Sequence, residues 1–127
     1  MFRRFSPALA VLLVSSTAVF AQGGAKPTDP HIAHIAYTAG VIDIEAAKQA
    51  RKMPHNKDVR AFPESMVKDH DAVNKQALDL CARLKVKPED NDTSKAPAKQ
   101  AADKRAELAK LSGAAFDKAY IENEVAY

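Results

Sequence analysis

The sequence predicts an all-α protein, an incomplete antiparallel bundle of about three long helices and a partial fourth. Apolar residues recur at spacings of three and four over several long segments, which is the helical period. The chain has 127 residues, of which 46% are hydrophobic and 28% charged. That composition is typical of a single, mostly helical globular domain.

Residues 1–21 have the three-part layout of a secretory signal peptide. Arg3 and Arg4 precede an apolar run from residue 8 to residue 20, and small residues surround Ala21. The run is shorter than the roughly 20 residues that a permanent membrane helix needs, so an uncleaved anchor is the less favoured alternative. We therefore expect cleavage after Ala21, a flexible leader at 22–28, export to the periplasm, and no transmembrane segment after cleavage.

The charges exclude two classes of partner. Without Arg3 and Arg4 the chain carries 17 basic and 16 acidic residues, and opposite signs alternate along it, as in 103–110. Nucleic acids and anionic membranes are thus poor partners. Cys81 is the single cysteine, which rules out an internal disulfide. We expect a buried thiol there, with an intermolecular bridge as the alternative.

The first helix is expected to begin at Asp29, an N-cap carboxylate followed by Pro30, and to end at Met53, which precedes a proline. Its apolar residues form two adjacent stripes, which predicts burial over a wide arc. The first stripe is Ile32, Ile35, Ala39, Ile42 and Ala46, and the second is Tyr37, Val41 and Ile44.

A second helix is expected from the N-cap Asn56 to about Val86, before Lys87 and Pro88. Pro63 breaks the local rule, so either this helix kinks or its regular part begins at Pro63. The predicted core stripe has nearly heptad spacing and includes one imidazole: Val59, Phe62, Met66, His70, Val73, Ala77, Leu80 and Leu84.

Two further helical segments follow. One is expected from near Ser94 to Leu111, with Pro97 in its first turn and a thin apolar face of Ala101, Leu108 and Leu111. Ser112 and Gly113 then interrupt the pattern. Helical spacing resumes over 114–127 with Phe116, Tyr120, Ile121 and Val125, and no closing signal precedes Tyr127.

Two motifs resemble a bacterial family catalogued as domain of unknown function 4142, often labelled predicted outer-membrane protein and related to ferritin-like four-helix bundles. One is M-V-x-D-H-x-x-x-N and the other S-G-x-x-F-D-x-x-Y, and the similarity covers about 29–127. The resemblance implies candidate site residues on the second and last helices: Met66, Asp69, His70, Asn74, Phe116, Asp117 and Tyr120.

The resemblance also implies two departures from the family pattern. Members usually have a helix-friendly residue at the position of Pro63. They also continue past the equivalent of Tyr127 with a second histidine and further helix. The chain is thus interpreted as a truncated member, in which exposed apolar faces favour low stability or self-association.

His70 has two readings. It is either a partly buried histidine bonded to a neighbouring carboxylate or backbone group, or a pH-responsive or metal-linked group facing the bundle core. Di-iron chemistry is disfavoured because Val67 stands where a Glu-x-x-His pair needs glutamate, and Glu64 is six residues away. His31 and His34 are spaced to reach one metal ion, but a surface pair without function is the favoured interpretation, since zinc needs three or four protein ligands. His55 is expected in a solvated loop.

Three functions remain open. The first is a non-enzymatic bundle that acts by interaction in the cell envelope, under stress as the family label loosely suggests. The second is a protein that binds a metal or small molecule, centred on His70 or on His31 and His34. The third reading is a truncated member that has lost its function. No glycine-rich phosphate loop, nucleophile elbow or cysteine–histidine pair points to catalysis or to a cofactor.

Overall fold

The computed structural model describes residues 26–53 and 56–127, and this part of the chain is all-helical. The prediction of an all-α protein is therefore confirmed, whereas the ferritin-like relationship stays a prediction. The signal peptide, most of the leader and His55 lie outside the described residues. The four helices are α1 (Asp29–Arg51), α2 (Lys57–Arg83), α3 (Asp92–Leu108) and α4 (Gly113–Ala126).

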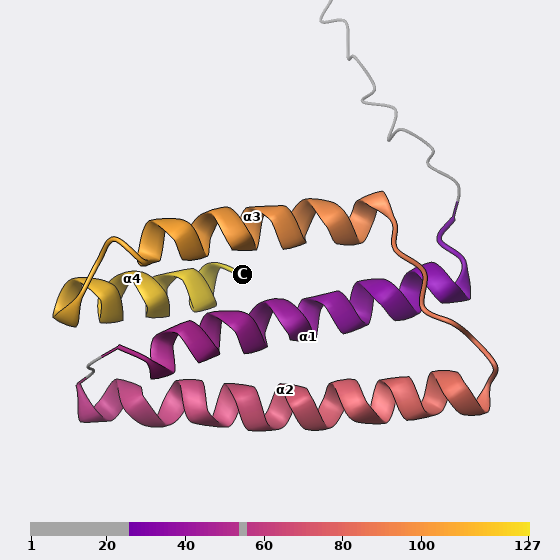
Figure 1. The fold of residues 1–127 in the computed structure, drawn as a ribbon, viewed down its shortest axis with the longest axis horizontal. Helices are drawn as coiled ribbons and strands as arrows, with labels where there is room; N and C mark the ends of the chain where they lie inside the picture. The colour runs from indigo at the N-terminus through magenta and orange to yellow at the C-terminus, as the bar shows by residue number, and fades with distance from the viewer. Residues whose placement is uncertain (1–25, 54–55) are drawn as a thin grey trace, which may run out of the picture.

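The helices pack around α1, which contacts both α2 and α3, while α3 also contacts α4. α1 and α2 run side by side in opposite directions, and α4 lies near the end where α1 stops and α2 begins (Figure 1). α4 has 14 residues and α2 has 27. At 1.5 Å per residue these are lengths of about 21 Å and about 40 Å, so α4 accompanies only about half of α2.

The starts of the first two helices follow the polar residues before them. Asn56 accepts a hydrogen bond from the Asp58 N–H at 3.0 Å, as expected of the N-cap of α2. In α1 the N-cap is Thr28, without a side-chain bond, and Asp29 is already helical. The expected N-cap role of Asp29 is therefore wrong by one residue, although its carboxylate still lies in the first turn, where the helix dipole favours negative charge.

The limits of α3 differ from the expected 94–111. Asn91 and Ser94 form a reciprocal capping box, which starts the helix at Asp92 and leaves Pro97 in the second turn. The helix ends at Leu108, so Leu111 lies beyond it and is 36% exposed. The capping box satisfies two N-terminal N–H groups at once, and that outweighs the preference for Pro97 in the first turn, on which the expected start rested.

Pro63 lies inside a continuous α2, because the helix begins at Lys57. The alternative in which the regular part begins at Pro63 is therefore wrong. The ring is fully buried. Proline has no N–H to offer the Val59 carbonyl, and burial of its ring offsets part of that loss.

The core lies between the second half of α1, the end of α3 and α4. Its cluster of buried residues is Ala46, Ala50, Leu108, Phe116 and Tyr120. The Phe116 and Tyr120 rings stack with centroids 6.0 Å apart, and Phe62 of α2 meets Tyr120 at the same separation in a tilted arrangement. In α1, Ile42, Ile44 and Ala46 are buried as expected, but Ile32 is 51% exposed.

The predicted core stripe of α2 is wrong over its second half. Val73, Leu80 and Leu84 are 59%, 47% and 64% exposed. α2 instead presents a neighbouring row to α1, in which His70 and Asn74 make the contacts. The reason is coverage, because Tyr120 of α4 contacts the first half of the predicted stripe at Phe62, and no described element lies over the second half. Cys81 is a free, half-buried thiol, less buried than expected.

Candidate functional site

The motif histidine pairs with a carboxylate of the neighbouring helix. His70 Nε2 lies 3.4 Å from Asp43 Oδ2, and the two side chains are 31% and 13% exposed. Asp43 stands within the apolar second half of α1, where it is mostly withdrawn from water. The pair links α1 to α2 near mid-height and becomes an ion pair when the imidazole is protonated.

A second carboxylate from α4 faces the same region. Burial raises the pKa of Glu124, the Asn123 amide donates to its Oε1 at 3.4 Å and opposes that shift, and the charge of Asp43 raises the pKa further. Burial also raises the pKa of Asp43, against a lowering by His70. The charges of Asp43 and His70 thus act on Glu124, and the charge of His70 acts on Asp43.

Tyr120 completes what we call the acid–histidine cluster, namely Asp43, His70, Tyr120 and Glu124. Its ring is fully buried and its hydroxyl has no hydrogen-bond partner among the described residues. Burial raises the pKa of Tyr120, as do the charges of Glu124 and Asp43. The phenol therefore stays neutral, a buried donor beside two carboxylates.

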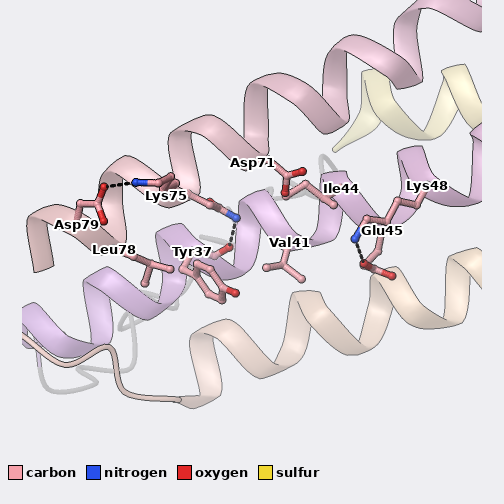
Figure 2. Close-up of a pocket in the computed structure, with 10 residues that line it drawn as sticks. Tyr37, Val41, Ile44, Glu45, Lys48, Asp71, Lys75, Leu78 and Asp79 are labelled. Atoms are coloured by element: carbon pink, nitrogen blue, oxygen red, sulfur yellow. Dashed lines mark hydrogen bonds and ion pairs between the residues drawn. The ribbon is translucent and has the colours of Figure 1, made fainter. Parts of the chain in front are cut away.

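Asn74 of the motif packs two helices together at close range. Its Nδ2 donates to the Tyr37 carbonyl at 3.4 Å, and a Cβ built on Gly40 would lie 2.8 Å from that nitrogen. Glycine thus lets the carboxamide reach the α1 backbone. Asn74 and Tyr37 line an open pocket of about 440 Å³. The Lys75–Asp79 and Lys48–Glu45 ion pairs lie at the same pocket (Figure 2).

His34 joins α1 to the start of α3. Its Nδ1 lies 2.9 Å from Ser94 Oγ and 3.3 Å from Thr38 Oγ1, and Ser94 is 1% exposed. The Ser94 hydroxyl donates to Asp90 Oδ1 at 3.1 Å. His31 contributes to this junction through its carbonyl, which accepts from the Asn91 amide at 3.3 Å. The two histidines expected to share a metal are thus each tied into the capping region of α3.

The remaining motif residues differ in their surroundings. Phe116 is fully buried, and the buried Asp117 accepts a hydrogen bond from the Asn56 N–H at 3.0 Å, which ties α4 to the start of α2. Met66 is half-buried, whereas Asp69 is exposed. Five of the seven motif residues therefore hold helices together, namely His70, Asn74, Phe116, Asp117 and Tyr120.

Among residues 26–53 and 56–127, no group of three or more His, Cys, Asp or Glu side chains is arranged to hold a metal ion. In the same part of the chain, no helix combines the length and the apolar character that crossing a bilayer demands. Metal binding at His70 or at His31 and His34 stays a prediction.

A mostly apolar groove lies at the other end of the bundle. This groove of about 270 Å³ runs between the first half of α1 and the last turns of α2. Its wall includes Ile32 and Leu78, which are 51% and 40% exposed. Leu80 and Leu84 form its α2 edge, so the groove adjoins the exposed row of α2.

Sequence reasoning missed Asp43, Glu124 and Gly40. A signal existed for two of them: Asp43 interrupts the apolar run VIDI, and Gly40 stands in the middle of a helical pattern where glycine costs stability unless close packing needs it. For Glu124 there was none, since an acidic residue near a helix end is usually solvated.

Comparison with known proteins adds one relationship. A sequence profile described as "Domain of unknown function (DUF4142)" matches residues 14–127. A search of curated proteins and a search of solved structures found no match. The matched segment contains all four helices and every member of the acid–histidine cluster. The chain therefore belongs to the DUF4142 family.

Proposed function

We propose that this protein is an exported, non-enzymatic helical bundle of the cell envelope that acts by binding an amphipathic helix. The contact surface is the open face of α2, defined as Val73, Ala77, Leu80 and Leu84. Export is supported by the pattern of residues 1–21, and the periplasm is the proposed compartment.

The open face is the observation that carries the proposal. Three of its members are about half or more exposed, and Ile32 and Leu78 extend the apolar surface toward the groove. Soluble proteins expose single apolar residues freely, but contiguous apolar rows beside a groove usually mark a contact surface. A helix of a partner would bury this row in the way that the first half of α2 is covered by α4.

The role of the motif side chains supports a function without catalysis. His70, Asn74 and Asp117 each bridge two helices through the contacts described above. These contacts give each of the three side chains a structural role within the bundle. We also propose that the bundle is related to ferritin-like proteins and that it acts under envelope stress.

A photo-crosslinking experiment in cells tests the proposal. A photoreactive residue at Leu80 is expected to give one adduct of defined mass in the osmotic-shock fraction, and the same residue at the exposed Ala102 of α3 is expected to give none. Adducts at both positions, or at neither, contradict a specific contact through the open face. Recovery of the protein only from the cytoplasm contradicts the export.

One observation favours the second candidate, metal binding at His70. Its Nε2 and the Asp43 Oδ2 are separated by 3.4 Å, a distance that two ligands of one small cation also show. Titration with zinc, copper and iron tests it, with His31→Ala as the control that leaves the pair intact. Binding no tighter than about millimolar, or binding unchanged in His70→Ala, removes this candidate.

A further inference from the structure

We infer that the partner helix is α2 of a second copy of this chain, paired antiparallel through the open face about a two-fold axis near Gln76 and Ala77. The inference rests on the proposed function, since it names the occupant of the same surface. It follows from the spacing of the exposed apolar residues and from the charges beside them.

The spacing suits helix-to-helix pairing. The members of the open face succeed one another by four, three and four residues, which is the seam spacing of a coiled coil. A seam of this kind is self-complementary when two copies meet around a two-fold axis, because each copy offers the same row. With the axis near Gln76 and Ala77, Val73 lies opposite Leu80 of the partner subunit, and the reverse contact repeats it.

The flanking charges set the direction. Asp69, Gln76 and Arg83 follow one another by seven residues along one edge of the open face. Asp69 and Arg83 are exposed, and neither takes part in an ion pair within the described part of the chain. Antiparallel pairing brings Asp69 beside Arg83 of the partner subunit on both sides of the axis. In parallel pairing, Asp69 lies level with Asp69 of the partner subunit and Arg83 with Arg83 of the partner subunit, so opposite charges do not meet.

The arrangement also leaves room for α4. The segment from Asp69 to Leu84 spans about 24 Å of helix, and α4 meets α2 outside it, at Phe62. Because the axis lies near Gln76 and Ala77, the end of the partner's α2 lies level with Asp69 and does not reach α4. One helix pair of this length buries less than a standard interface, so the dimer is expected to be weak and dependent on concentration.

Charge reversal on the purified protein, followed by sedimentation equilibrium, tests the pairing. Asp69→Arg and Arg83→Asp each convert two attractive pairs into two repulsive ones, and each is expected to weaken dimerisation about tenfold or more. The double variant restores opposite charges in both pairs and is expected to recover the affinity of the parent. The matched control is the reversed pair Lys75→Asp with Asp79→Lys, which lies on the far side of α2 and should change nothing.

Far-UV circular dichroism shows that each variant keeps its helix content, so that loss of dimer is not loss of fold. A monomer at all concentrations, or a double variant that fails to recover, overturns the inference. The proposed function is still supported after such a result if a photoreactive residue at Leu80 gives a specific adduct in cells. The mass of that adduct is then expected to differ from twice the mass of the chain. A recovered double variant together with an adduct of twice the chain mass supports both.

Discussion

The Asn74 carboxamide lies against Gly40 of the neighbouring helix, where a side chain on residue 40 would occupy the same space. Replacement Gly40→Ala gains about 1 kcal/mol of helix propensity but overpacks the contact, which costs about 1–3 kcal/mol. We expect a net loss of up to about 2 kcal/mol in the free energy of unfolding, measured by urea denaturation.

The double variant separates the two effects of this change. Asn74→Ala removes the carboxamide, so Gly40→Ala introduced on that background is expected to be neutral or stabilising. Equal losses from Gly40→Ala on both backgrounds would show that the crowding does not come from Asn74.

The buried carboxyls predict a pH dependence of stability. Burial raises the pKa of Asp43 and of Glu124 above their ordinary values of 3.8 and 4.5. A group with a raised folded pKa adds stability that is complete below its unfolded pKa and is lost as pH rises through the folded pKa. The stability that these carboxyls contribute is therefore expected to fall as pH rises above about 4, by at most about 1.4 kcal/mol per pH unit for each.

Glu124→Gln is the variant that isolates this effect, since it keeps shape and loses the titration. Urea midpoints taken from about pH 4 to about pH 7 should fall less steeply in this variant than in the parent. Glu64→Gln, at an exposed position of α2, is the control and should leave the slope unchanged. If the urea midpoint of Glu124→Gln falls with pH as steeply as that of the parent, the pH dependence does not come from Glu124.

The unpartnered hydroxyl of Tyr120 predicts an unusual pair of outcomes. Tyr120→Phe removes a buried donor that has no acceptor, so we expect a stability change between zero and a gain of about 1 kcal/mol. Tyr120→Ala also removes the ring from the core and is expected to cost about 3–5 kcal/mol. Thermal unfolding compares the two, and a loss above about 1 kcal/mol in Tyr120→Phe would reveal a bonded hydroxyl.

Ser94 has two roles, in the capping box of α3 and in the bond to His34. Ser94→Ala should therefore cost about 1–2 kcal/mol, or roughly 4–8 °C in Tm for each kcal/mol in a domain of this size. Thr93→Ala, at the exposed neighbouring position, is the control. Similar melting of the two variants would mean that the junction of α1 and α3 does not depend on the Ser94 hydroxyl.

Much of the fold was predictable because its signals are local. Asn56 precedes an amphipathic run and caps it, and Phe116 and Tyr120, four residues apart, share a helix face that the core covers. The predicted start of α3 was wrong by two residues. Asn91 and Ser94 are both residue types that favour the N-cap position, and only the capping box formed in the structure shows that Asn91 takes it.

The candidate site was predictable only in part. His70 and Asn74 stood out in the sequence through the family motif, but their partners Asp43 and Gly40 are about 30 residues away along the chain. Such pairs depend on the relative shift of two helices along their axes. Helical periodicity gives the face of a side chain and contains no information on that shift.

By itself the sequence determined the helix content, the approximate helix ends and the aromatic core, since each follows from spacing or capping within one segment. Only the tertiary structure decided which side of α2 meets α1. Two adjacent rows of α2 have heptad spacing and share His70 and Ala77, so the pattern permits either row to face α1. The first row also contains Met66, Val73, Leu80 and Leu84, and the second also contains Pro63, Val67, Asn74 and Cys81. α1 took the second row because Asn74 reaches the α1 backbone over Gly40 and His70 meets Asp43, and the short α4 left the end of the first row exposed.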